Sequence, residues 1–120
     1  MPAPPLRILL AGDAPAADAR VAMEAAGFEV RATGLGGIDP AEVARAGAVV
    51  IDVAARTLNT AQSLCRRWRI ELGERFVPIV WLTGADVSAA AGLDSGADAV
   101  LRQTDAAEQL VPQVKALLRV

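Results

Sequence analysis

Short apolar runs recur along the chain and alternate with longer segments of mixed polarity. Arg7–Ala11, Ala48–Val53 and Phe76–Leu82 are nearly continuous apolar stretches, a pattern typical of buried parallel strands. Phe28–Ala32 alternates apolar and polar residues, which favours a strand nearer the edge of a sheet. Ala99–Leu101 is a short apolar segment and completes a set of five predicted strands.

The segments between these strands have the periodicity of helices. Asp39 followed by Pro40 is typical of a helix cap and first helical residue. The predicted helices cover residues 15–26, 40–46, 59–71, 86–93 and 105–119. Strands that alternate with helices form a parallel sheet covered on both faces, and right-handed crossovers wind it in both directions. The sequence therefore predicts an α/β fold, a doubly wound five-stranded parallel sheet in a three-layer α/β/α sandwich, with residues 1–120 as one domain.

Composition narrows the functions that such a domain can have. The chain has no histidine, which excludes an imidazole base or a histidine-ligated metal within it. Its net charge of −2 gives no general attraction to nucleic acid, and no apolar run approaches the roughly 20 residues of a membrane span. The one cysteine, Cys65, cannot form an intramolecular disulfide and fits the reducing cytoplasm, where we expect the protein to reside.

Three polar side chains follow or end predicted strands. Asp13 follows the first strand, Asp52 closes the third and Thr83 follows the fourth. In a doubly wound sheet, ligands bind outside these carboxyl ends. Asp52 stands within an apolar stretch, so a cation or hydrogen-bond donors must compensate its desolvation. Two convergent carboxylates would suit Mg²⁺, which prefers oxygen ligands.

At this point the chain resembles a known family, the receiver domains of two-component response regulators. The resemblance covers nearly the whole length. It is carried by the segments RILLAGDAP, AVVIDV, LCRRWR, VPIVWLTG and GLDSGADAVL, the last of which is similar to the family's GLEAGADDYL. The resemblance implies the receiver type of the flavodoxin-like fold and a role in signal transduction rather than catalysis. It also implies a histidine kinase or an output domain as partners, or self-association through residues 86–120.

The resemblance also implies a role for each candidate site residue. Asp52 takes the phosphoacceptor position and Thr83 the position of the switch hydroxyl. Asp13 and Asp52, with the backbone carbonyl of Ala54, take the positions of the ligands to Mg²⁺. Gln103 stands where the family has a lysine.

The sequence departs from the family at several of these positions. Gly12 replaces the second acid of the metal-binding pair, and Val100 replaces the aromatic switch residue. Gln103 can donate a hydrogen bond but brings no positive charge for a phosphoryl group. Losing such a contact reduces the rate of transfer by about a hundredfold. These departures predict a degenerate receiver domain with weak or absent phosphorylation and weakened or lost metal binding, which acts as a protein-interaction or dimerisation module.

Two other functions stay open from the sequence. The domain could be a working receiver that a histidine kinase phosphorylates on Asp52, or a flavodoxin-like binder of a small cofactor. Each candidate residue also has a simpler interpretation. Asp52 could be satisfied by loop amides, Asp13 could cap the first helix, and Thr83 could be bonded locally. The arginines in the predicted third helix would form a solvated face, namely Arg66, Arg67 and Arg69.

Overall fold

The computed structural model describes residues 6–12 and 17–118 of the chain. Their five strands are β1 (Arg7–Ala11), β2 (Glu29–Thr33), β3 (Ala48–Val53), β4 (Ile79–Thr83) and β5 (Ala99–Arg102). All neighbouring strands are parallel, in the order β2-β1-β3-β4-β5. The predicted doubly wound sheet is confirmed.

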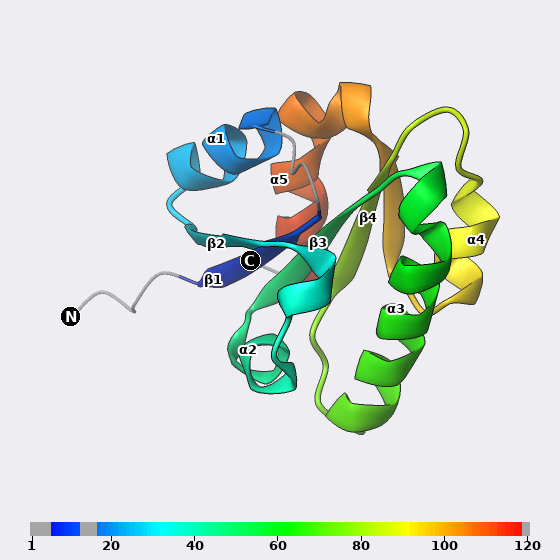
Figure 1. Ribbon diagram of the computed structural model, residues 1–120. Coiled ribbons are helices and arrows are strands. Elements are labelled where there is room, and N and C mark those ends of the chain that lie inside the picture. Colours follow the sequence, from blue (N-terminus) through cyan, green and yellow to red (C-terminus); the bar gives the residue numbers. More distant parts are fainter. Residues whose placement is uncertain (1–5, 13–16, 119–120) are drawn as a thin grey trace.

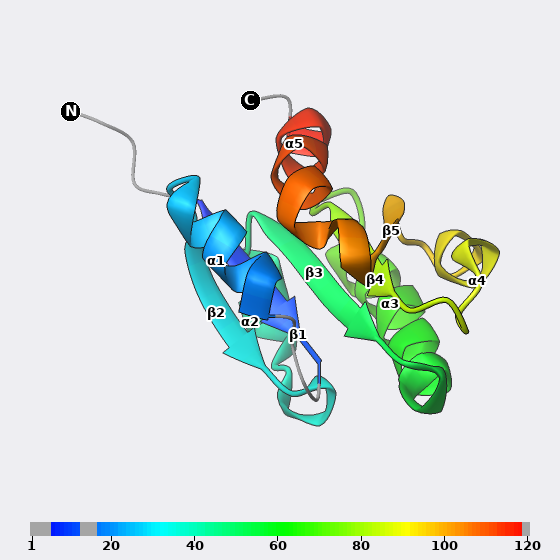
Figure 2. The same ribbon diagram turned by 90° about the horizontal axis from the view of Figure 1, so that it is seen from above.

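Five α-helices connect the strands and cover both faces of the sheet (Figure 1). The α-helices are α1 (Ala17–Ala25), α2 (Pro40–Arg45), α3 (Leu58–Leu72), α4 (Ala89–Asp94) and α5 (Ala106–Leu118). Viewed from above, α1 and α5 lie together on one side of the sheet, and β2 lies at one outer edge (Figure 2). None of the described helices has the length and apolar character needed to cross a bilayer.

Alternate side chains of the central strands point to opposite faces of the sheet and pack into two separate hydrophobic cores. One core joins the sheet to α2 and α3 and includes Ile51, Trp68 and Trp81. The other joins the sheet to α1 and α5 and includes Val50 and Leu110. Because β3 is buried on both faces, its apolar run is continuous, as expected of a central parallel strand.

The largest differences from the predicted boundaries are at the starts of β4 and α4. β4 starts at Ile79, and Phe76, predicted to begin it, is 59% exposed. α4 starts at Ala89, because Val87 donates its backbone N–H to Gly84 in a turn before the helix. The sequence also predicts that Pro112 bends the last helix or delays its start. α5 begins at Ala106 and continues through Pro112, so the start is not delayed.

Helix α4 packs unusually closely against the sheet at Gly92. A Cβ atom at this position would lie 2.8 Å from Cγ2 of Val100 and 2.9 Å from Cε3 of Trp81. Trp81 is fully buried and stands beside Val100 in the β4–β5 register. The indole of Trp81 thus fills the space beneath α4, and only a residue without a side chain fits over it.

Arg69 of α3 ties together three segments that the sequence separates. Its Nε donates to the carbonyl of Gly96 at 2.8 Å and its Nη1 to the carbonyl of Val77 at 3.0 Å. Its Nη2 pairs with the carboxylate of Asp98, which also accepts the backbone N–H of Ile79 at 2.7 Å. The two side chains are 26% and 23% exposed. The guanidinium group therefore holds α3, the segment before β4 and the segment before β5 in one arrangement.

This network corrects the interpretation of the arginine cluster as a solvated face. Arg66 and Arg67 are exposed, as predicted, but Arg69 is partly buried. Arg69 lies next to the buried Trp68 along α3, and its long side chain reaches backbone carbonyls that would otherwise lack a donor.

Candidate functional site

The candidate site residues lie at the carboxyl ends of β3, β4 and β5. Asp52 is the penultimate residue of β3, Thr83 is the last residue of β4, and Gln103 directly follows β5. The strand order reverses between β1 and β3, which in doubly wound sheets marks the usual ligand crevice. The fold therefore brings this group to the edge where a receiver-like site is expected (Figure 1).

Asp52 is engaged by a side-chain amide. Nε2 of Gln103 donates a hydrogen bond to Oδ1 of Asp52. The register of the sheet places the two residues on the same face. Asp52 is in register with Leu82, and Leu82 is in register with Leu101, which precedes Gln103 by two residues. The neutral amide thus occupies a carboxylate oxygen of Asp52 without adding the positive charge that a lysine would bring.

The backbone carbonyl of Ala54 is also engaged. It accepts a hydrogen bond from the hydroxyl of Thr57 at 3.1 Å and another from the backbone N–H of Thr57 at 3.0 Å. The Thr57 hydroxyl lies 3.0 Å from the backbone nitrogen of Ala54 as well. A carbonyl oxygen has two lone pairs, so this turn uses the acceptor capacity that a metal ion would require.

Gly12, at the end of β1, approaches Asp52 closely. A Cβ atom at Gly12 would lie 3.1 Å from both Cβ and the backbone oxygen of Asp52. The φ angle of Gly12 is +155°, in a region that residues with side chains rarely adopt. The backbone N–H of Gly12 donates to the carbonyl of Thr33 at 3.0 Å, which fixes this position between β2 and β3. Contact and conformation together disfavour an acidic side chain at position 12, because a Cβ atom there would require Asp52 to shift by a few tenths of an ångström.

Thr83 lies on the other side of the sheet from Asp52 at this end. Thr83 is in register with Val53, whereas Asp52 is in register with Leu82. Thr83 is 3% exposed and has no side-chain hydrogen bond with any residue in the described ranges, so the predicted local bond of its hydroxyl is not found there. It lines a small cavity of about 100 Å³ whose other walls are Gly84, Ala85, Arg102, Gln103 and Thr104. Gln103 thus contacts Asp52 and also borders the cavity of Thr83.

Arg102 is closer to this site than the sequence suggested. Alternation along β5 predicts that its side chain points away from Asp52. Arg102 is in register with Thr83, and on that face of the sheet it lines the cavity beside Thr83. Arg102 therefore lies on the side of Thr83 rather than on that of Asp52.

The described donors fit Mg²⁺ poorly. Within residues 6–12 and 17–118 there is no group of three or more acidic, cysteine or histidine side chains that could hold a metal ion. Asp13, predicted as a ligand, lies outside the described residues. The remaining predicted ligands are Asp52, which Gln103 engages, and the carbonyl of Ala54, which Thr57 engages.

Sequence reasoning missed the part that Thr57 plays in this site. A threonine three residues after a loop residue can bond back to the backbone of that residue. Thr57 stands three residues after Ala54, the first residue beyond β3, so the sequence did contain this signal.

Comparisons with known proteins agree on the fold. No family model matches the sequence, and no curated protein matches it. Among solved structures, the receiver domain of RstA from Klebsiella pneumoniae, activated with BeF3, is 22% identical, with a TM-score of 0.72 over 95% of this chain and 99% of that one. An atypical orphan response regulator, described as having a phosphorylation-independent mechanism, is 16% identical, with a TM-score of 0.75 over 95% of this chain and 96% of that one.

A third similar structure has a different function. A cobalamin-binding protein from Desulfitobacterium hafniense is 18% identical, with a TM-score of 0.70. The match covers 91% of this chain but 58% of that protein. At these identities the likeness is one of fold, and the chain has the fold of response-regulator receiver domains.

Proposed function

We propose that the chain is a degenerate receiver domain of a response regulator, one domain that transmits signals through protein contacts rather than through phosphorylation. As a signalling module it would not be an enzyme. Its single cysteine is free and buried, which suits a reducing compartment such as the cytoplasm. A histidine kinase, an output domain or a second copy of the chain would be its partners.

The observation that carries this proposal is the hydrogen bond from Gln103 to Asp52. Phosphoryl transfer depends on positive charge placed around the moving oxygens. Gln103 supplies none, the backbone at Gly12 lies close to Asp52 and disfavours a side chain there, and Thr57 occupies the carbonyl of Ala54. Each of these contacts holds the site in an arrangement that disfavours both metal binding and transfer.

We expect no phosphorylated product when the protein is incubated with acetyl phosphate and Mg²⁺. Intact-mass spectrometry measures this directly, with Asp52→Asn as the matched control. The loss of the cationic contact alone reduces the rate by about a hundredfold, so any adduct should stay a minor species. An adduct on most molecules that disappears in Asp52→Asn would instead establish a working phosphoacceptor.

The surface that we propose for partner binding comprises α4, β5 and α5, within residues 86–120. β5 is the second outer strand of the sheet, and its residues Ala99, Val100 and Leu101 are only half-buried. Leu93 of α4 is 52% exposed. An apolar side chain on a helix next to a half-buried edge strand is typical of a surface that a partner covers.

Aspartate in place of Leu93 should weaken binding through this surface by more than tenfold, because a buried charge would replace an apolar contact. The measurement is the dissociation constant for a captured partner or for self-association. Ile70→Asp is the matched control, since Ile70 is also a helical, exposed apolar residue, at 80% exposure, but lies on α3. Equal effects of the two substitutions would contradict the proposed surface.

The alternative function of cofactor binding has weaker support. The cavity at the strand ends is about 100 Å³, whereas sites for cofactors and drug-sized ligands typically measure 300–1,000 Å³. The likeness to a cobalamin-binding protein therefore extends to the fold but not to a cavity of suitable size at this edge.

A further inference from the structure

Strand β2 forms an open edge of the sheet. It pairs with β1 on one side, and no other described strand lies on its other side (Figure 2). Three of its five residues are exposed and the other two are half-buried. An edge strand of this kind presents unpaired backbone groups to which another strand can bind.

The backbone contacts show which groups of β2 point outward. Glu29 donates its N–H to the carbonyl of Leu6, and Thr33 accepts from the N–H of Gly12. In a parallel ladder, every second residue directs both its N–H and its C=O to the same neighbour. Glu29, Arg31 and Thr33 therefore bond toward β1. Val30 and Ala32 direct their backbone groups away from it, toward the open edge.

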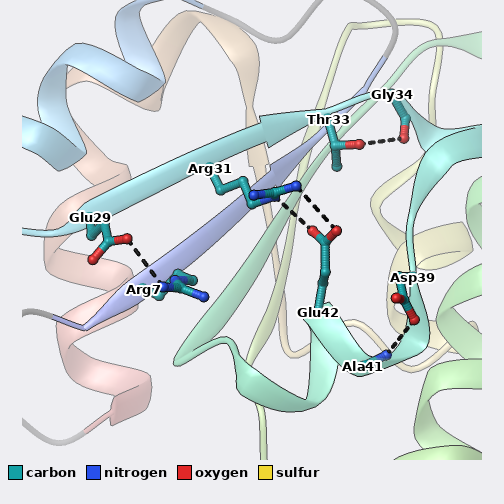
Figure 3. A network of polar contacts seen from close by, with 8 residues as sticks. All are labelled: Arg7, Glu29, Arg31, Thr33, Gly34, Asp39, Ala41 and Glu42. Carbon is teal, nitrogen blue, oxygen red and sulfur yellow. Dashed lines mark hydrogen bonds and ion pairs between the residues drawn. The ribbon is translucent and has the colours of Figure 1, made fainter.

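The side chains of β2 alternate in charge on the face that carries α2. Arg7 pairs with Glu29 at 3.3 Å, and Nε of Arg31 lies 2.9 Å from Oε2 of Glu42 (Figure 3). The side chain of Arg31 stays 62% exposed and that of Glu29 54% exposed. Each can therefore accept a second ion-pair partner from outside.

We propose that β2 pairs in antiparallel orientation with β2 of a second copy of this chain, with Val30 opposite the second copy's Val30. Both strands then offer the outward N–H and C=O of Val30 to each other, which makes a hydrogen-bonded pair on the twofold axis. The flanking positions bring Glu29 opposite the second copy's Arg31. These flanking pairs are of the non-hydrogen-bonded type, in which side chains lie closer together.

The resulting contact matches on both faces of the sheet. On the α2 face, charges of alternating sign follow one another across the interface, from Arg7 and Glu29 to the second copy's Arg31 and Glu42. On the α1 face, the half-buried Phe28 meets the second copy's exposed Ala32. Apolar residues therefore meet on one face and opposite charges on the other.

Other registers lack this complementarity. Pairing centred on Arg31 could also use the outward backbone groups, by setting Val30 opposite the second copy's Ala32. It would, however, set Arg31 directly opposite its own copy, and like charges in directly opposed positions are destabilising. Pairing centred on Ala32 would set Arg31 opposite Thr33 and Glu29 beyond the partner strand. Charged residues commonly protect an edge strand from pairing with another strand. Charges of alternating sign give little protection here, because the antiparallel partner strand places an opposite charge beside each of them.

Cysteine cross-linking tests this register. In a hydrogen-bonded antiparallel pair, opposite Cα atoms lie about 5.5 Å apart, within the range for a disulfide. Val30→Cys should therefore give a disulfide-linked dimer under mild oxidation. Ala32→Cys is the matched control, because its Cα would lie roughly 13 Å from that of its copy. The native Cys65 will not interfere, since it is fully buried and burial raises the pKa of its thiol to about 11.

Sedimentation velocity tests the association without a cross-link. The apparent mass of the wild type should rise with concentration above the monomer value of 12.4 kDa. Val30→Pro removes the outward N–H, a change that an edge strand tolerates, and should abolish the rise, whereas Val30→Thr keeps the amide and should preserve it. Leu93→Asp should leave cross-linking at position 30 unchanged, which separates this contact from the α4–β5–α5 surface. Equal cross-linking of the two cysteine variants, or association that Val30→Pro does not affect, would overturn the proposal.

Discussion

Methionine in place of Arg69 should lower the free energy of unfolding by about 3 kcal/mol. The substitution keeps the apolar stem of the side chain but removes the guanidinium group. The carbonyls of Gly96 and Val77 then lose their donors, and the carboxylate of Asp98, 23% exposed, loses its counter-charge. Chemical denaturation monitored by circular dichroism measures the loss.

Arg67→Met is the matched control for this experiment. Arg67 lies on the same helix and pairs with Glu71 at 3.0 Å, but its side chain is 62% exposed. An exposed pair four residues apart contributes about 0.3–0.5 kcal/mol. If the two variants lost similar stability, the Arg69 contacts would not hold α3 to the segments before β4 and β5. The double variant with Asp98→Asn should lose less than the sum of the two single changes, because the residues share one network.

Alanine in place of Trp81 should lower the free energy of unfolding by about 3–5 kcal/mol, the usual range for removing a buried aromatic side chain. Trp81 is fully buried in the core, and its indole lies directly beneath Gly92 of α4. The loss should appear as a lower denaturation midpoint with a similar slope.

A second substitution distinguishes this packing from simple loss of apolar area. In the wild type, Gly92→Ala should destabilise the fold by about 1–3 kcal/mol, because the new methyl group overlaps Trp81 and Val100. In the Trp81→Ala background the same change should cost less, since the overlap with the indole is gone and only that with Val100 remains. Equal effects in both backgrounds would show that the indole does not set the position of α4.

The sequence predicted the fold well because the buried central strands are almost entirely apolar. Ala48–Val53 coincides with β3, and it does so because a central parallel strand must be apolar on both faces. The start of β4 was misjudged because Phe76 continues the apolar run, although it is exposed in the structure. A single apolar residue at the end of a run does not reveal whether a partner strand extends that far.

The site was harder to predict because its contacts depend on close approach in three dimensions. The strand pattern placed Asp52 and Gln103 at the carboxyl ends of their strands, but the hydrogen bond between them reaches across β4 and depends on the loop after β5. Thr83 and Asp52 lie on different faces of the sheet because Thr83 is in register with Val53. This register cannot be read from either sequence segment alone. The part played by Arg69 depends on carbonyls that come from two distant loops.

The contact between Gly12 and Asp52 bears on how such a domain could change over time. With 3.1 Å between the virtual Cβ of Gly12 and Cβ of Asp52, and a φ angle of +155°, a carboxylate introduced at position 12 would require Asp52 to shift and the backbone to accept strain. A single change back to an acidic pair would therefore reduce the stability of the fold unless a second change nearby relieved this contact.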